Sequence, residues 1–251
     1  MESTDPDLVT APTVLLRFRR ALNLSMVAVI ALTAVFFQQR QISDLEPYML
    51  HPQQWSSLPA ILTAPLLHGS IEHLAANAFS VLVLGTLAGT VFPRATLRAL
   101  PLIWIGAGLG TWLIGTGGAH LGISGITHGL GFLVFTLALL RRDRASIAAA
   151  LIAFFFFGGM LLTILPREWG VSWEYHLSGA VMGILAGVLW RRADAMPPRR
   201  RYSWEDEPED DLEWQELEPT RPNDVPILWH RPERPPGGAV LPFRRRLQDD
   251  D

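Results

Sequence analysis

The chain of 251 residues contains no cysteine and no lysine. Without cysteine it has no disulfide framework, no thiol nucleophile and no cysteine-based metal site. All 21 basic residues are therefore arginine, and the formal net charge of −3 gives no indication of a nucleic-acid partner. The sequence also lacks an HExxH motif or any other ligand pair with the spacing of a zinc site, so no metal site is expected.

Hydrophobic residues make up 49% of the chain, and they are gathered in long blocks rather than spread at amphipathic spacing. Blocks of about 17–25 apolar residues have the length that an α-helix needs to cross the hydrocarbon core of a bilayer. The first block follows an acidic start without a basic region, so it is expected to be a retained anchor and not a cleaved signal peptide. The predicted fold class is an all-α membrane protein with six transmembrane helices, at residues 21–37, 71–92, 97–114, 123–140, 145–165 and 173–190.

Arginine is distributed unevenly between the two sides of this predicted bundle. Ten arginines would lie on one side, and only Arg40 and Arg167 on the other. Because cytoplasmic loops collect positive charge, the bias predicts an even number of spans with both termini in the cytoplasm. The second, fourth and sixth helices would then begin at the outer face of the membrane. The ten arginines are Arg17, Arg19, Arg20, Arg94, Arg98, Arg141, Arg142, Arg144, Arg191 and Arg192.

The two ends of the chain differ in composition from the apolar middle. Residues 1–16 are predicted to be a short cytoplasmic tail, and residues 17–192 the membrane domain. From Ala193 onward Pro, Arg, Glu and Asp dominate, with an acidic run at residues 205–211. This composition offers too little apolar surface to offset the entropy of ordering, so residues 193–251 are predicted to be a disordered cytoplasmic tail. Its tryptophans could form a docking motif for a cytoplasmic partner; they are Trp204, Trp214 and Trp229.

A serine and a histidine stand near the starts of two predicted helices. Ser124, in Gly122-Ile123-Ser124-Gly125, opens the fourth helix, and His176 lies near the start of the sixth. An ionisable residue within a membrane is costly unless it is satisfied, so it marks a functional site. A serine becomes a nucleophile when a neighbouring base takes its proton, and the pair therefore predicts nucleophilic acyl transfer. Glu174 is two residues from the histidine and cannot face the same way, so it is given at most an orienting role.

Small residues follow both members of this pair. One GxxxG pattern joins Gly125 and Gly129, and another joins Gly179 and Gly183. Small residues let transmembrane helices approach each other closely. Close packing of the fourth and sixth helices would bring the serine and the histidine within hydrogen-bonding distance. The alternative is a glycine zipper with an incidental serine bonded to its own helix backbone.

An acyl-transfer site also needs hydrogen-bond donors aimed at the developing oxyanion. His73 and Asn77 are four residues apart in the second predicted helix, so they share a face and can point at one spot. The backbone N–H of Ser124, unpaired at a helix N-terminus, would be the third donor. A polar pair satisfied between helices is the alternative for His73 and Asn77. His68 lies about 140° around the helix from His73, so it is expected outside this cluster, holding the helix to the preceding loop.

Three motifs together resemble the rhomboid intramembrane proteases: His68-Gly-Ser-Ile-Glu-His73-Leu-Ala-Ala-Asn77, Gly122-Ile-Ser124-Gly125 and His176-Leu-Ser-Gly179-Ala-Val-Met-Gly183. The resemblance covers about residues 17–192. It implies a six-helix rhomboid bundle with a water-filled cavity that opens to the outer face. It also implies that Ser124 is the nucleophile, that His176 is the general base, and that His73, Asn77 and the Ser124 N–H form the oxyanion hole. No ATP, metal or other cofactor is implied.

The sequence departs from the family pattern at two places. Four residues after the serine the family usually carries an aromatic residue against which the catalytic histidine packs, whereas this chain has His128. His128 faces the same side as Ser124, so it could stack similarly, donate a proton or alter the pH dependence, and it is a candidate modulator. The first loop, residues 38–67, lacks the Trp-Arg pair that many members carry, and it is expected to lie in the interface or to fold back on the bundle.

The predicted function is that of an intramembrane serine endopeptidase, which cleaves transmembrane helices of membrane-protein substrates with a Ser-His dyad. The alternative is a catalytically inactive rhomboid-like protein that binds membrane clients. Inactive relatives commonly lose the serine or the histidine, and this chain keeps both. A transporter or a metal-binding bundle would place charged residues in the middle of its spans, and there are none. The predicted location is a bacterial plasma membrane.

Overall fold

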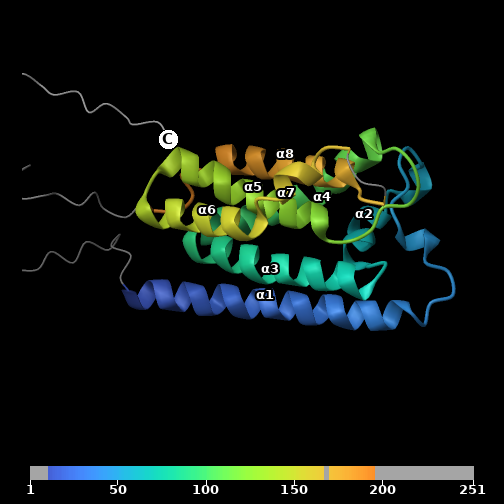
Figure 1. The fold of residues 1–251 in the computed structure, drawn as a ribbon, viewed down its shortest axis with the longest axis horizontal. Helices are drawn as coiled ribbons and strands as arrows, with labels where there is room; N and C mark the ends of the chain where they lie inside the picture. The colour runs from blue at the N-terminus through green and yellow to red at the C-terminus, as the bar shows by residue number, and fades with distance from the viewer. Residues whose placement is uncertain (1–10, 167–169, 196–251) are drawn as a thin grey trace, which may run out of the picture. The chain divides into compact units, whose positions relative to one another are not determined.

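The computed structural model describes residues 11–166 and 170–195, and these ranges are largely helical. Figure 1 shows long helices running side by side, with short turns in the connection between α1 and α3. The α-helices are α1 (Ala11–Gln39), α2 (Ala60–Thr63), α3 (Ile71–Val91), α4 (Pro93–Ile114), α5 (Ser124–Arg141), α6 (Arg144–Phe157), α7 (Met160–Thr163) and α8 (Trp173–Leu189). The 3-10 helices are η1 (Glu46–Tyr48), η2 (Trp55–Ser57) and η3 (Ala64–Leu66).

Four of these helices, α1, α3, α4 and α5, are long and apolar enough to cross a membrane. The protein is therefore a multi-pass membrane protein. α6 has 14 residues and α8 has 17. At about 1.5 Å per residue, each is shorter than a hydrocarbon core of roughly 30 Å. The number of six spans remains a prediction.

The predicted fifth helix, over residues 145–165, is interrupted. α6 ends at Phe157 and α7 begins at Met160, with Gly158 and Gly159 between them. Glycine costs about 1 kcal/mol relative to alanine in a helix interior, so two in succession favour a break. After this interruption α7 lies beside the starts of α5 and α8, where Thr163 contacts His128 and His176.

Local sequence fixes where several helices begin. The Ser70 hydroxyl precedes α3 and accepts the backbone N–H of His73 at 3.1 Å. α4 begins with Pro93, which suits a first helical position because the N–H that proline lacks would have no partner there. The Asp143 carboxylate precedes α6 and accepts the N–H of Ser146 at 3.0 Å. Such caps satisfy backbone donors that the helix itself leaves unpaired.

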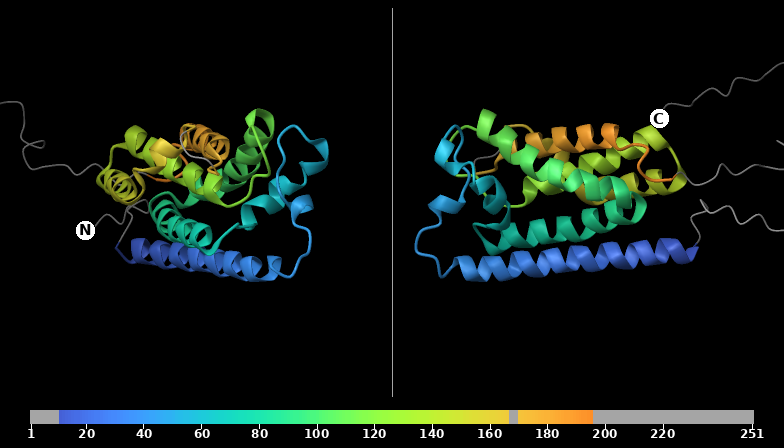
Figure 2. Two further views of the ribbon diagram at one scale, coloured as in Figure 1. Left: turned by 45° about the vertical axis from the view of Figure 1, so that its right-hand side comes forward. Right: turned by 180° about the vertical axis from the view of Figure 1, so that it is seen from behind.

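The backbones of α5 and α8 are in contact. Gly125 and Gly129 of α5 face Gly179 and Gly183 of α8. A Cβ on Gly179 would overlap the carbonyl oxygen of Gly125, and one on Gly183 would overlap that of Gly129. This is the close approach predicted from the two GxxxG patterns, and it gives α5 and α8 the most extensive helix contact in the described part of the chain. Figure 2 shows α1 packed along α3, on the side of the bundle away from α8.

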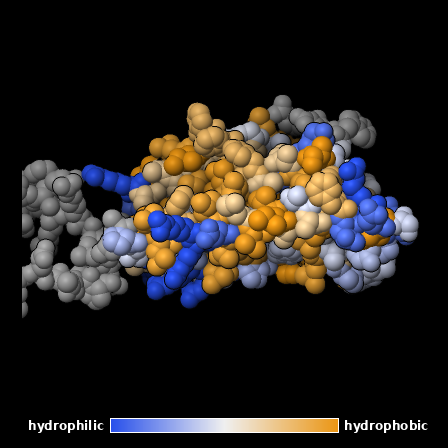
Figure 3. All heavy atoms as spheres, turned by 90° about the horizontal axis from the view of Figure 1, so that it is seen from below, coloured by the Kyte–Doolittle hydropathy of each residue, from blue (hydrophilic) through white to orange (hydrophobic). Residues whose placement is uncertain are grey.

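The apolar core lies between α3, α4 and α5, where Leu84, Ile103 and Leu133 are fully buried. Large hydrophobic side chains also cover the outside, and Leu139 and Phe155 are 72% and 82% exposed. Figure 3 shows hydrophobic residues along the helices, with hydrophilic residues gathered nearer the ends. An exterior with many exposed large hydrophobic side chains is suited to contact with lipid.

The first loop folds back on α4. The Gln53 side-chain amide donates at 3.1–3.2 Å to three carbonyls at the end of that helix, those of Trp112, Leu113 and Gly115. The last carbonyls of a helix have no partners of their own within the helix, so a side-chain amide stabilises them. The Trp112 indole N–H in turn donates to the carbonyl of Gln54 at 2.9 Å. The loop is thus tied to the bundle by glutamine and tryptophan, without the Trp-Arg pair.

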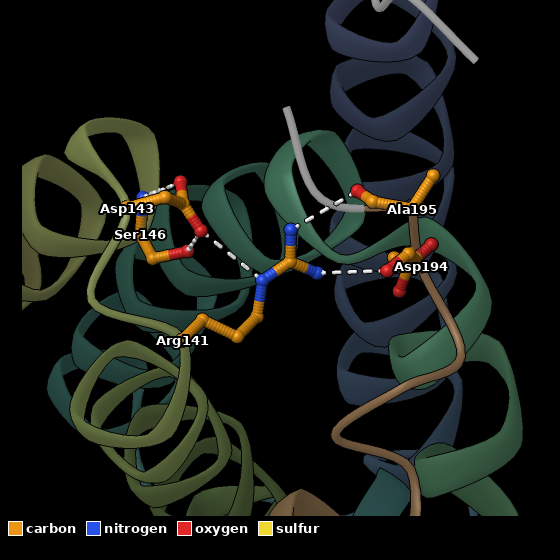
Figure 4. A network of polar contacts seen from close by, with 5 residues as sticks. All are labelled: Arg141, Asp143, Ser146, Asp194 and Ala195. Carbon is orange, nitrogen blue, oxygen red and sulfur yellow. Dashed lines mark hydrogen bonds and ion pairs between the residues drawn. The ribbon is translucent and has the colours of Figure 1, made fainter. Parts of the chain in front are cut away.

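A buried arginine joins three elements at the end of the bundle where α5 stops (Figure 4). Arg141 donates from Nε to Asp143 at 3.1 Å, and from its terminal nitrogens to the carbonyls of Asp194 and Ala195 at 3.2 and 3.1 Å. The Asp194 carboxylate accepts two backbone N–H groups in the first turn of α4, both at 2.9 Å. Residues 193–195, assigned from composition to the tail, therefore belong to the bundle. The rest of the predicted tail lies outside the described residues.

Arg141→Met is expected to destabilise the protein by about 3 kcal/mol, because the partly buried Asp143 carboxylate and the carbonyls of Asp194 and Ala195 lose the donors of a buried guanidinium. The midpoint of thermal unfolding of the purified protein in detergent measures this loss. Arg98→Met changes an exposed arginine on α4 and serves as the control. The control is expected to alter stability by less than about 0.5 kcal/mol, and equal midpoints for the two variants would contradict the structural role of Arg141.

Candidate active site

Ser124 and His176 come from two helices and meet at the starts of both. Ser124 is the first residue of α5, and His176 lies in the first turn of α8. The His176 Nε2 atom is 2.9 Å from the Ser124 Oγ atom, which is a hydrogen-bonding distance. Both are within a turn of the contact between Gly125 and Gly179. The close approach of the two helix backbones therefore positions the pair.

The second ring nitrogen of His176 is held by α7. Its Nδ1 atom is 3.1 Å from the carbonyl oxygen of Thr163. A carbonyl oxygen can only accept a hydrogen bond, so Nδ1 carries the hydrogen and Nε2 of the neutral ring is an acceptor. The Ser124 hydroxyl can then donate to Nε2, the arrangement in which a histidine serves as a base toward a serine. Sequence reasoning missed Thr163, because no spacing or motif relates it to His176.

His128 lies one turn after Ser124 and stacks on His176. The ring centroids are 3.9 Å apart, and the ring planes are 11° from parallel. Nδ1 of His128 is 2.7 Å from the Ser124 carbonyl oxygen, and Nε2 is 2.9 Å from the Thr163 hydroxyl. The four-residue spacing placed His128 on this face of the helix, and its ring covers the face of His176.

His73 and Asn77 lie against the turn that precedes Ser124. Gly122 in this turn has a φ of 102°, and a Cβ added to it would lie 2.6 Å from the His73 ring and 3.6 Å from Asn77 Nδ2. Asn77 Nδ2 is buried and has no hydrogen-bond partner among the described residues. A buried donor without a partner costs stability. Such a donor, lying against the turn that leads into Ser124, is available to an anionic group.

A family model, the Rhomboid domain, matches residues 52–193, which is more than half of the chain. The chain belongs to the rhomboid family. Its relatives include uncharacterized protein Rv1337 of Mycobacterium tuberculosis and uncharacterized protein Mb1372 of Mycobacterium bovis, each 38% identical over 156 residues, or 59% of this chain and 65% of the relative. Uncharacterized protein ML1171 of Mycobacterium leprae is 38% identical over 136 residues, 50% of this chain and 53% of the relative. The chain thus matches less than two thirds of the length of each relative.

In this rhomboid His68 lies nearer to the site than its sequence position indicated. The expectation that it stands outside the cluster is wrong, because its ring packs edge-on against that of His73 with centroids 5.1 Å apart. The helical-wheel argument assumed that His68 is part of the helix, whereas α3 begins only at Ile71. The Gln39 side chain holds both the N–H and the carbonyl of His68, which ties α1 to the start of α3. Burial lowers the pKa of His68 to about 4, so its ring is neutral near pH 7.

In this rhomboid the Glu174 carboxylate bonds Thr116 and makes no hydrogen bond to the imidazole of His176. The carboxylate accepts the backbone N–H and the hydroxyl of Thr116 at 3.0 and 2.7 Å. Thr116 follows α4, so this contact ties α4 to the helix turn that carries His176. An orienting role for Glu174 stays a prediction, and these contacts would exert it through the backbone of α8 rather than through the imidazole.

A cavity of about 500 Å³ opens at the same end of the rhomboid bundle, lined by residues 116–120 and 170–174 together with Pro166. Within it the His120 Nδ1 atom bonds the Ser172 hydroxyl, and the His120 backbone forms an isolated bridge with Leu50. Ser124 and His176 are not among its lining residues. Among the described residues, no group of three or more His, Asp or Glu side chains converges to hold a metal ion.

Proposed function

We propose that this rhomboid is an intramembrane serine endopeptidase. The observation that carries the proposal is the 2.9 Å contact between Ser124 Oγ and His176 Nε2, made while His176 Nδ1 is engaged by a carbonyl oxygen. The serine hydroxyl then has a base for its proton, which is the requirement for nucleophilic attack. Because the site lies in a bundle of apolar helices, its substrates are membrane proteins, cleaved within or just outside a transmembrane helix.

In the proposed reaction Ser124 Oγ attacks the scissile carbonyl carbon while its proton passes to His176 Nε2. The O–H bond breaks, a C–O bond forms, and the carbonyl π electrons move onto oxygen. His176 then gives the proton to the leaving amine as the C–N bond breaks, which leaves an acyl-enzyme. A water molecule then attacks the ester carbonyl carbon and gives a proton to His176 Nε2. The bond between this carbon and Ser124 Oγ breaks, Oγ takes the proton back from His176, and the carboxylic acid product is released. The Thr163 carbonyl accepts from Nδ1–H throughout and stabilises the charged ring.

Asn77→Ala is expected to lower kcat by about 10²–10³-fold with a smaller effect on KM, because a donor to the developing oxyanion acts mainly in the transition state. Cleavage kinetics in proteoliposomes measure both constants, and His73→Ala is expected to act in the same direction. Ser80→Ala removes a polar group from another turn of α3, where the hydroxyl bonds the Ala76 carbonyl, and should leave both constants unchanged. A raised KM with unchanged kcat in Asn77→Ala would assign this residue to substrate binding instead.

We further propose that six helical segments span the membrane, with α6 and α7 together as the fifth and α8 as the sixth. Arg94, Arg141 and Arg142 lie at the ends of helices opposite to the dyad, which supports a cytoplasmic location for those ends. The mycobacterial relatives support a bacterial plasma membrane. Residues 196–251 would then offer a cytoplasmic partner a docking segment. Reporter fusions at the loops test this topology.

The proposed activity is tested by cleavage of a generic transmembrane substrate by the purified protein in proteoliposomes. A fluorophosphonate probe, which reacts with activated serines, is applied to the same sample. We expect both cleavage and labelling. If a folded preparation, shown by cooperative unfolding, is tested on several substrates and shows neither cleavage nor labelling, that outcome would favour the alternative of an inactive rhomboid-like protein that binds membrane clients.

A further inference from the structure

We propose that Thr163 is a positioning residue, which holds both imidazoles of the His128–His176 stack and so sets the orientation of the general base. The inference rests on the proposed protease activity, because that activity gives the orientation of His176 its function. Thr163 ends α7, the four-residue helix that follows the Gly158–Gly159 break. Its hydrogen bonds reach the two histidines rather than the Ser124 hydroxyl, so it acts through them.

Two different atoms of Thr163 make these contacts. Its carbonyl oxygen lies 3.1 Å from Nδ1 of His176, and its hydroxyl oxygen lies 2.9 Å from Nε2 of His128. The other nitrogen of each ring faces Ser124: His176 Nε2 contacts the hydroxyl, and His128 Nδ1 contacts the carbonyl. The contacts therefore form a closed loop through Ser124, His176, Thr163 and His128. Both stacked rings are fixed at two edges.

The positions of the hydrogens in this loop follow from the atoms that can only accept a hydrogen bond. His128 Nδ1 faces a carbonyl oxygen, so it carries a hydrogen. In the neutral ring Nε2 is then an acceptor, and the Thr163 hydroxyl donates to it. When His128 is charged, Nε2–H donates to Thr163, whose hydroxyl can turn to the Met160 carbonyl 3.0 Å away. Thr163 thus satisfies His128 in either protonation state without any movement of the ring.

The orientation of His176 depends on these contacts together with its contact to Ser124, because the packing of α8 fixes only the backbone that carries the ring. The glycine contact between α5 and α8 sets the two backbones and does not by itself set the side-chain torsions of the imidazole. Glu174, the nearest acidic residue in sequence, is engaged by Thr116. Thr163 therefore takes the orienting position at Nδ1, and the stacked His128 confines the ring plane. A misplacement of about 1 Å at a reacting group can cost on the order of 10²-fold in rate.

The hydroxyl of Thr163 can be removed while the carbonyl stays. Thr163→Val keeps the side-chain shape, and we expect it to lower kcat in proteoliposomes by about tenfold with KM changed by less than about twofold, the effect of one lost hydrogen bond. Thr163→Ser keeps the hydroxyl and is expected to retain kcat to within about twofold. Thr90→Val is the matched control, because it removes a threonine hydroxyl that bonds the Thr86 carbonyl within α3. It is expected to be as active as wild type.

Measurement of Thr163→Val in a second variant, His128→Phe, separates a positioning role of Thr163 from a general effect on the fold. In His128→Phe the ring can still stack but cannot bond Thr163. We expect Thr163→Val to change kcat by less than about twofold in this background, because the contact it deletes is already gone. A similar loss of kcat in both backgrounds would overturn the proposal, and so would wild-type kcat in Thr163→Val alone. If the valine variant does not fold, Thr163→Ser and Thr163→Ala provide the comparison, since they differ only in the hydroxyl, and equal kcat overturns the proposal.

Nitrogen-15 NMR of the imidazoles reports the same contact without reference to activity. The His128 Nε2 resonance is expected to shift in Thr163→Val and to stay in place in Thr163→Ser. An unshifted resonance in Thr163→Val overturns the positioning role whether or not the protein cleaves anything. If the wild-type protein cleaves no more substrate than Ser124→Ala does, the proposed function is overturned, whereas the contact between Thr163 and His128 is not.

Discussion

Ser124→Ala and His176→Ala are each expected to abolish cleavage, with kcat lowered by about 10⁴-fold or more. The first change removes the nucleophilic oxygen, and the second leaves the hydroxyl without a base for its proton. Because the two residues act as one unit, the double variant is expected to be no less active than either single variant. Single-turnover cleavage of a transmembrane substrate in proteoliposomes measures all three rates.

The folding of these variants is checked by thermal unfolding, since both changes remove buried polar contacts. Residual cleavage by folded Ser124→Ala above about one hundredth of the wild-type rate would place the nucleophile elsewhere. An inactive wild type would direct attention to His128, which stands where the family usually has an aromatic residue. His128→Tyr is then the first variant to make. In an active protein the same variant tests whether His128 alters the pH–activity profile, because an unchanged profile would exclude that role.

Gly179→Ala and Gly183→Ala are expected to be the most damaging single-methyl changes in the bundle. A Cβ at either position would overlap a carbonyl oxygen of α5, so the two helices must separate. Overpacking of this kind costs about 1–3 kcal/mol. Activity is expected to suffer more than stability, with a loss on the order of 10²-fold, because the same contact sets the distance between Ser124 and His176. Thermal unfolding and cleavage kinetics measure the two effects.

Gly159→Ala is the matched control for these variants. A Cβ at Gly159 would meet no atom within 4 Å, and the residue has an ordinary helical conformation with φ of −61°. Alanine there is expected to be neutral, or to stabilise the protein by up to about 1 kcal/mol through the unfolded state. If Gly179→Ala and Gly159→Ala unfold at the same temperature and cleave at the same rate, the backbone contact does not hold the site together.

The residues of the candidate site could be named from the sequence because their signals are local. Hydrophobic blocks mark the helices, and small residues four apart mark the contact between α5 and α8. Four site residues each stand near the start of a predicted helix: Ser124, His176, His73 and Asn77. The predicted topology starts these helices at the same face of the membrane, so it placed the four residues at a similar depth in the bilayer. The same local reasoning failed at His68, because a helical wheel applies only inside a helix and the sequence did not reveal that α3 begins at Ile71.

The sequence by itself determined that this is a helical membrane protein of the rhomboid type, with a serine and a histidine on two helices that can approach closely. Periodicity, composition and motif spacing are properties of residues close together in the chain, so they can be read without a structure. Only the tertiary structure brought the Thr163 carbonyl next to the imidazole of His176. Thr163 and Asp194 act on residues 13 and about 100 positions away, through hydrogen bonds to backbone groups. Such bonds depend on where distant segments of the chain meet as well as on the side chains they carry, so no spacing in the sequence predicts them.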